Sequence, residues 1–183
     1  MFDRVFYVSY GSNLLESRFQ EYIENARWMK RGEWDEEMLD EYPASYRVNL
    51  ARDTYYAMGS ARWGGGIAFL DIDKFSAKKV YRAYDLNMTQ FYAVFSQENG
   101  YCDDEIDWDE LLHFGYYDST AYIYDRIVLL GWMNSTPVLT FTHSRPSLMV
   151  IKEPGPKYTD VINRGRKETR TLPFVPITES QYV

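Results

Sequence analysis

The start of the chain changes from a strand-like run of hydrophobic residues to a helix-like alternation of apolar and charged ones. Residues 5–10, VFYVSY, are rich in β-branched and aromatic side chains, which predicts a strand. The turn-forming residues Gly11, Ser12 and Asn13 end this run. In residues 14–29 apolar side chains recur at helical spacing, so we predict a helix with Ser12 or Asn13 as its N-cap. The chain therefore opens as a strand, a tight polar loop and a helix.

Most of the remaining pattern is typical of strands. We predict strands at residues 46–51, 67–72, 79–86, 121–131 and 136–142, and an extended C-terminal segment at 171–183. Gly64, Gly65 and Gly66 precede the second of these strands. We interpret them as a turn, although glycine also lets the backbone approach a ligand or another strand closely.

Further helices are predicted between these strands. One covers residues 89–98, with Thr89 as its N-cap and Asn99-Gly100 as its stop. An amphipathic helix is expected around 104–114, another follows the Pro/Gly-rich start of residues 153–168, and residues 30–44 form a charged excursion with one short helix. No repeat or linker interrupts the chain, so we predict one α+β domain over residues 1–183, or a closed barrel.

The charge and composition restrict the partners of this protein. A net charge of −7 argues against a nucleic acid or an anionic membrane surface as partner, because both require a basic face. One cysteine and two histidines permit no intrachain disulfide and make a His/Cys metal site unexpected.

Residues 1–13 lack the basic and apolar regions of a signal peptide, and no apolar run is long enough to span a membrane, so we expect a cytoplasmic protein. The 17 Tyr, 10 Phe and 5 Trp favour strands or the lining of a small-molecule pocket.

The loop between the first strand and the first helix carries a resemblance to a known family. Tyr10-Gly11-Ser12-Asn13-Leu14 is similar to the Tyr-Gly-Ser-Asn-Leu loop of gamma-glutamyl cyclotransferases, although an ordinary capped turn uses the same residues. Similar elements follow in the family's order. They are residues 63–68, 80–86 and 86–98, the triplet Tyr124-Asp125-Arg126, and residues 154–173 with Tyr158.

The resemblance implies a small mixed β-barrel with a few flanking helices, and an enzyme that cyclises a γ-glutamyl amide to 5-oxoproline and releases an amine. It implies that Glu98 is catalytic and that no cofactor or metal takes part. It assigns substrate binding to Tyr10, Gly11, Ser12, Asn13, Leu14, Tyr124 and Tyr158. Two positions depart from the family pattern, which has an acidic residue in place of Phe95 and a glycine in place of Asn99.

The chemistry of the reaction explains why a carboxylate is needed. The substrate's α-amine attacks its own γ-carbonyl, so a base must take a proton from the amine and the departing nitrogen must receive one. Glu98 suits this role because the negative end of its helix favours the protonated carboxyl. The alternative interpretation is an ordinary surface glutamate. Glu105 is a rival carboxylate within an acidic run that has the composition of a solvated helix face, and Arg126 would bind either a substrate carboxylate or Asp118 or Asp125.

Three functions remain open at this stage. The first is a cyclotransferase acting on a γ-glutamyl amino acid, amine or peptide. The second is a non-catalytic relative that binds a small ligand or a protein partner. The third is an enzyme recruited to a different amide, since dense aromatics near a barrel mouth would favour a larger planar substrate. Residues 28–43 and 100–120 are longer than in compact relatives, and they leave the substrate open because loops at a barrel mouth determine what can enter. The sequence does not indicate the oligomeric state.

Overall fold

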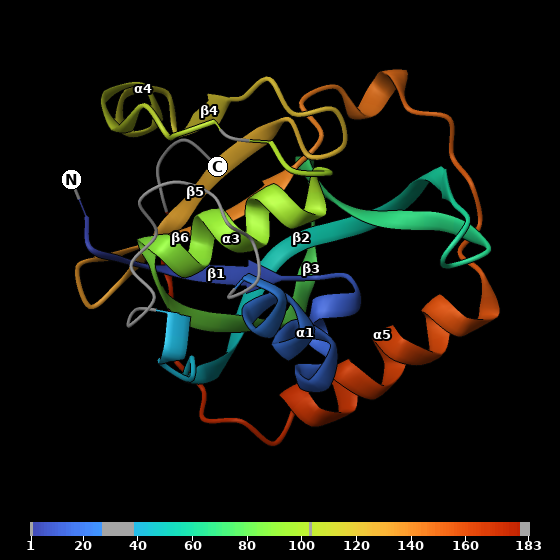
Figure 1. Cartoon of the computed structure of the whole chain (residues 1–183), viewed down its shortest axis with the longest axis horizontal. Coiled ribbons are helices and arrows are strands. Elements are labelled where there is room, and N and C mark those ends of the chain that lie inside the picture. The colour runs from blue at the N-terminus through green and yellow to red at the C-terminus, as the bar shows by residue number, and fades with distance from the viewer. Residues whose placement is uncertain (1, 27–38, 103, 180–183) are drawn as a thin grey trace.

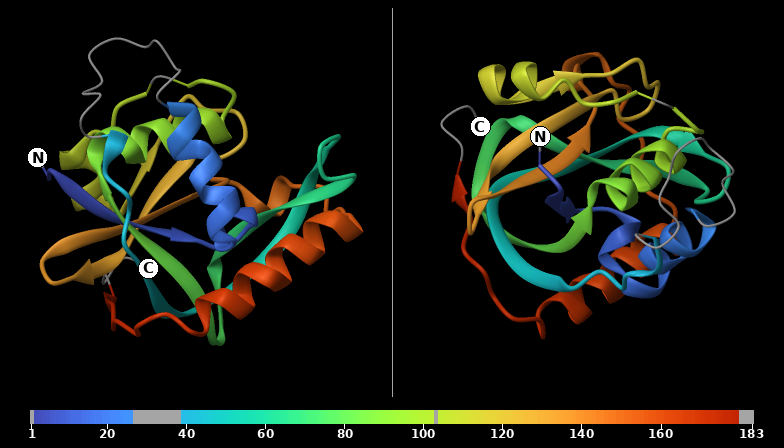
Figure 2. Two further views of the ribbon diagram at one scale, coloured as in Figure 1. Left: turned by 60° about the horizontal axis from the view of Figure 1, so that its bottom comes forward. Right: turned by 60° about the vertical axis from the view of Figure 1, so that its left-hand side comes forward.

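The protein is built on a curled mixed sheet. The computed structural model describes residues 2–26, 39–102 and 104–179. The strands are β1 (Arg4–Ser9), β2 (Ser45–Ser60), β3 (Gly65–Asn87), β4 (Tyr116–Asp118), β5 (Arg126–Met133), β6 (Thr136–Thr142) and β7 (Thr178–Glu179). Their order is β2-β3-β1-β6-β5-β4, with β7 paired to β5, and β1 runs parallel to β6 while the other named pairs are antiparallel. The sheet bends into a half-barrel with helices around it, which confirms the predicted α+β class (Figures 1 and 2).

Two of the predicted strands are a single long one. Residues 67–72 and 79–86 both belong to β3, which pairs with β2 from Tyr84 opposite Ser45 to Gly65 opposite Ser60. Most of the residues between them are exposed, and in this stretch only Phe75 has a register partner, Arg52, on the shorter strand β2. The far end of this hairpin projects beside the C-terminal helix (Figure 1). The predicted break was wrong because the extended conformation continues through this irregularity in the pairing, so both segments belong to one strand.

The helices are α1 (Glu16–Ala26), α3 (Met88–Glu98), α4 (Trp108–Phe114) and α5 (Pro156–Thr169), with a short 3₁₀ turn, η1, at Ser12–Leu14. The helix α3 starts earlier than predicted. Asn87, not Thr89, is its N-cap, because Asn87 Oδ1 accepts a hydrogen bond from the Gln90 N–H at 2.9 Å and the Gln90 side chain accepts one from the Asn87 N–H. The helix α1 starts later, after η1, so neither Ser12 nor Asn13 is its N-cap. None of the described helices is long and apolar enough to cross a membrane.

The segments around β5 are more irregular than expected. The predicted strand 121–131 begins only at Arg126, because the Asp125 carboxylate accepts hydrogen bonds from the Ser144 N–H and hydroxyl at 2.6 and 2.7 Å and fixes the preceding residues as a loop. The predicted helix 104–114 begins at Trp108, after its N-cap Asp107. Most of the predicted excursion at 30–44 lies outside the described residues.

The three consecutive glycines serve two purposes. Gly64 has a φ of 66° and belongs to the hairpin turn, as predicted. Gly65 and Gly66 lie inside β3, where an added Cβ would come within 2.3 Å of the Gly155 nitrogen and 2.1 Å of the Lys152 oxygen respectively. They therefore permit close approach of the backbone that leads into α5, which the interpretation as a simple turn had missed.

The helix α5 presses against the polar loop that follows β1. Its buried face consists of Tyr158, Ile162, Gly165 and Thr169, which recur at helical spacing. A Cβ added at Gly165 would lie 2.4 Å from the Leu14 carbonyl carbon. Glycine at this position lets the helix backbone touch the η1 turn directly, so α5 fixes the position of that loop.

We expect Gly165→Ala to destabilise the protein, because the added methyl group meets backbone atoms that cannot move aside. The overpacking should lower the free energy of unfolding by about 1–3 kcal/mol, even though alanine is the better helix former. Urea denaturation would measure this, with the exposed Asn163→Ala on the same helix as the control. Equal stability of the two variants would mean that α5 does not clamp the loop.

Candidate functional site

A carboxylate at the end of α3 meets the polar loop that follows β1. Glu98 is the last residue of α3 and is partly buried. Asn13 Nδ2 donates a hydrogen bond of 2.8 Å to Glu98 Oε1, although the two residues are far apart in sequence. The parts of the chain that the sequence analysis singled out as loop and base are therefore in direct contact.

The loop that carries Asn13 is held from two sides. The Tyr84 hydroxyl, on β3, donates a hydrogen bond of 2.8 Å to the Asn13 carbonyl oxygen. On the other side, a Cβ added at Gly11 would lie 2.8 Å from the Tyr158 hydroxyl, so glycine makes room for that ring. Leu14 is buried beneath the loop against α5 and does not line the cavities described below.

Tyrosine side chains enclose a small inner cavity of about 20 Å³ next to Glu98. Its lining consists of Tyr7, Tyr10, Gly11, Ser12, Asn13, Glu98, Tyr124, Phe141 and Tyr158. Three of the hydroxyl groups bond to the backbone, and this fixes their rings. Tyr10 donates to the Phe141 carbonyl at 2.6 Å and Tyr124 to the Ala68 carbonyl at 3.3 Å, while Tyr158 accepts from the Ala68 N–H at 3.2 Å. Burial raises the pKa of each of these hydroxyls, so they remain protonated at neutral pH.

Two side chains of α1 also act on Glu98. Arg18 Nη2 donates a hydrogen bond of 2.8 Å to the Tyr22 hydroxyl, and that hydroxyl acts on Glu98 by favouring the charged carboxylate. Arg18 and Tyr22 are four residues apart and so lie on the same helix face. Both side chains are buried. Arg18 therefore brings a positive charge near the Glu98 carboxylate, although its ion pair, at 2.6 Å, is with Glu21 and not with Glu98.

The pKa of Glu98 is raised above its usual value. Burial is the largest cause, because it penalises the charged carboxylate. Hydrogen bonds from Tyr22 and Asn13, and the positive charges of Arg18 and Arg62, act in the opposite direction but do not cancel it. A carboxyl group with a raised pKa can both accept and return a proton near neutral pH.

A larger vestibule of about 330 Å³ adjoins the inner cavity and shares Ser12, Glu98, Tyr124 and Tyr158 with it. This volume falls in the usual range for small-molecule sites. Its other walls come from α1, from the tip of the β2–β3 hairpin and from the loop before β5. They are Arg18, Tyr22, Met58, Gly59, Ser60, Arg62, Trp63, Ile67, Tyr122 and Ile123.

The positions that depart from the family pattern have structural roles. Phe95 is buried in the core, with its ring 5.5 Å from that of Phe141. Asn99 Oδ1 accepts a hydrogen bond of 2.8 Å from the Tyr124 N–H, so this residue anchors the loop that carries Tyr124.

The rival Glu105 is exposed and lines neither cavity. Arg126 pairs with Asp118 at 2.6 and 2.7 Å rather than facing either cavity.

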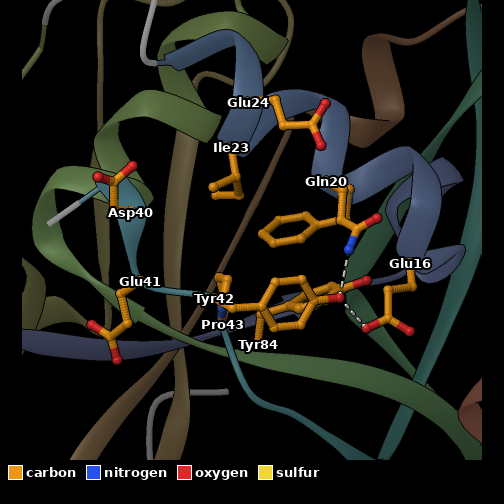
Figure 3. A pocket seen from close by; sticks show the side chains of 10 residues that line it. Glu16, Gln20, Ile23, Glu24, Asp40, Glu41, Tyr42, Pro43 and Tyr84 are labelled. Atoms are coloured by element: carbon orange, nitrogen blue, oxygen red, sulfur yellow. Dashed lines mark hydrogen bonds between the residues drawn. The ribbon is translucent and has the colours of Figure 1, made fainter. Parts of the chain in front are cut away.

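A separate hollow of about 100 Å³ lies between α1 and residues 40–43. Figure 3 shows the Tyr42 hydroxyl between Gln20 and Glu16, joined to both by hydrogen bonds of 2.6 Å. Two of its carboxylates are already paired, Glu16 with Arg82 at 2.9 Å and Glu41 with Arg4 at 2.9 Å. The hollow does not have the arrangement found around Glu98, where an asparagine and several tyrosines surround a carboxyl group.

Several site residues have no counterpart in the sequence analysis. Tyr7, Tyr22, Phe141 and Arg18 line the recess or contact Glu98, but each was indistinguishable from a core or surface residue. The contact of Arg18 with Tyr22 could be expected from their helical spacing, but its direction toward Glu98 could not.

Comparison with known proteins supports the fold. No family model matches the sequence, and no curated protein matches it. A structure of gamma-glutamyl cyclotransferase is similar with a TM-score of 0.54 and 15% identity, over 92% of this chain and 81% of that one. An uncharacterised protein from Homo sapiens gives a TM-score of 0.51 and 14% identity, over 100% of this chain and 92% of that one. YkqA from Bacillus subtilis gives 0.47 and 14%, over 94% and 56%. The chain has the fold of gamma-glutamyl cyclotransferase, as the resemblance implied.

We expect Asn13→Ala to raise the pKa of Glu98 further, because it removes a hydrogen bond that stabilises the charged carboxylate. The carboxyl carbon of Glu98 can be followed by NMR in protein labelled with ¹³C-glutamate, with Glu98→Gln identifying its signal. A pKa that stays unchanged or falls in Asn13→Ala would show that the contact does not stabilise the carboxylate.

Stability should also depend on pH through Glu98. A folded-state pKa above the unfolded value contributes stability that is complete below the unfolded pKa, about 4.3, and is lost as pH rises through the folded one. Glu98→Gln removes this titration. We therefore expect the melting temperature of the variant, relative to the native chain, to be higher at pH 8 than at pH 4. A difference that does not vary with pH, or varies in the opposite direction, would contradict a raised pKa.

Proposed function

We propose that this protein is a cyclotransferase that converts a γ-glutamyl amide to 5-oxoproline and releases the amine. The observation that carries this proposal is the contact between Glu98 and Asn13 in an aromatic recess, in a chain with the fold of gamma-glutamyl cyclotransferase. The reaction needs one proton-transferring group near a bound glutamyl amine, and Glu98 supplies it.

Glu98 acts first as base and then as acid. The substrate's α-ammonium gives a proton to the Glu98 carboxylate, and the freed nitrogen attacks the γ-carbonyl carbon. A carbon–nitrogen bond forms as the five-membered ring closes, and the original amide bond breaks. Two protons leave the attacking nitrogen in all, and two reach the departing amine, with Glu98 carrying them. A positioned carboxyl group of this kind accelerates such a reaction by about 10²–10⁴-fold.

Asn13 completes the amine site. Its Oδ1 lies in the lining of the inner cavity and has no hydrogen-bond partner among the described residues. A buried amide oxygen without a partner is costly, and an ammonium group at this point would satisfy it. Asn13 therefore orients Glu98 with its nitrogen and receives the substrate's α-ammonium with its oxygen.

The remaining residues orient the glutamyl group. We assign the developing oxyanion on the γ-carbonyl to the backbone N–H groups of the turn formed by Gly11, Ser12 and Asn13. The inner cavity has space for about one water-sized group, so it takes the reacting end of the substrate while the rest lies in the vestibule. Tyr124 and Tyr158 form the wall between these two spaces.

Glu98→Gln should abolish turnover while preserving the fold, because glutamine keeps the size of the side chain but cannot take up the proton. We expect at least a 100-fold loss of 5-oxoproline release, measured by mass spectrometry on γ-glutamyl amino acids, γ-glutamylamines and glutathione. Glu105→Gln, at the exposed rival carboxylate, is the matched control and should retain activity. Full activity of Glu98→Gln would assign the base to another residue, and inactivity of the native chain on every substrate would contradict the proposed reaction.

A further inference from the structure

The vestibule outside Glu98 has two features that the cyclisation itself does not require. The first is its aromatic and apolar wall. Met58, Trp63 and Ile67 come from the tip of the β2–β3 hairpin, and Tyr122 and Ile123 come from the opposite loop. The Trp63 ring packs on Tyr158 with centroids 4.9 Å apart, and this contact joins the wall to the inner cavity. Flat and apolar groups from two separate segments of the chain thus line the vestibule.

The second feature is positive charge. Arg18 and Arg62 line the vestibule, and among its described lining residues Glu98 is the only acidic one. Arg62 Nη2 lies 3.2 Å from Glu21 Oε2, and its guanidinium carbon lies 5.3 Å from the Trp63 ring centroid. A guanidinium has five donors, so the contact with Glu21 leaves Arg62 able to bind a further carboxylate. Arg62 is more than half exposed and can reach a ligand in the vestibule.

These features point to what occupies the vestibule during the reaction. We propose that it is the leaving-group subsite and that it selects amides in which the departing amine is an aromatic amino acid, such as γ-glutamyl-phenylalanine. This inference rests on the proposed function. The aromatic side chain lies between the hairpin tip and Tyr122, and the carboxylate of the departing amino acid meets Arg62.

The arginines and the apolar wall of the vestibule together distinguish amides of aromatic amino acids from other γ-glutamyl amides. A polyamine would bring a second positive charge toward Arg18 and Arg62, and repulsion would oppose its binding. A small amino acid such as alanine would reach Arg62 but leave the apolar wall exposed to water. An amine with a ring but no carboxylate would cover the wall and leave Arg62 without a ligand.

Three substrates isolate the two contacts. They are γ-glutamyl-phenylalanine, γ-glutamyl-alanine, which lacks the ring, and γ-glutamyl-2-phenylethylamide, which lacks the carboxylate. We expect the native chain to prefer the first over each of the others by about tenfold in kcat/KM for 5-oxoproline release, in keeping with one apolar contact or one charged hydrogen bond.

Two exposed-residue variants assign each preference. Arg62→Gln should remove the preference over γ-glutamyl-2-phenylethylamide. The loss of the Arg62 charge also acts on the pKa of Glu98, but this effect is common to both amides and cancels in the ratio of their kcat/KM values. Tyr122→Ala should reduce the preference over γ-glutamyl-alanine. Tyr122 is 78% exposed, so the change should not affect folding. Arg164→Gln on α5 and Phe75→Ala on β3, both exposed and outside the vestibule, are the matched controls and should keep both preferences.

Binding to the Glu98→Gln variant, measured by calorimetry, separates this inference from the reaction. Turnover of all three amides at equal rates, or preferences that survive both variants, would overturn the subsite and leave the cyclotransferase reaction standing. If none is turned over, tighter binding of γ-glutamyl-phenylalanine that Arg62→Gln abolishes would support the subsite and contradict the reaction. If no amide is turned over and the three amides bind equally or not at all, both the subsite and the cyclotransferase reaction are overturned.

Discussion

The hydrogen bond between Asn13 and Glu98 connects the two halves of the candidate site, and the rest of the architecture keeps its partners in place. Asn13 depends on a turn that is held by the Tyr84 hydroxyl and by the close contact of α5 at Gly165. Glu98 depends on α3, whose start is fixed by the capping box at Asn87. Each partner is thus positioned by packing and hydrogen bonds far from the contact itself, as a preorganised site requires.

Burial and hydrogen bonding act in opposite directions on Glu98, and that opposition gives the site its chemical character. Removal of water favours the neutral carboxyl, while Tyr22, Asn13 and the charges of Arg18 and Arg62 favour the carboxylate. The net effect is a raised pKa, which suits a group that must take up a proton and return it within one reaction. The surrounding tyrosines stay neutral because burial raises their pKa, so they orient groups without competing for the proton.

The local elements could largely be read from the sequence, whereas the long-range contacts could not. Residues 136–142 and the end of the helix at Glu98 agree with the pattern, because alternation and an Asn-Gly stop are local signals. The length of β3 was missed because its exposed middle, where the pairing with β2 is irregular, has the polar composition of a loop. Tyr22 and Arg18 were missed because only the packing of α1 against α3 brings them to Glu98. The resemblance named the loop and the glutamate, but their hydrogen bond is a property of the fold.

The most direct test of this account is a crystal structure of the Glu98→Gln variant with γ-glutamyl-phenylalanine. The account predicts that the α-amine lies within hydrogen-bonding distance of Asn13 Oδ1 and of the side chain at position 98. It also predicts that the γ-carbonyl oxygen faces the Gly11–Asn13 backbone. A ligand whose amine points away from position 98, or one bound instead in the hollow beside Tyr42, would contradict it (Figure 3).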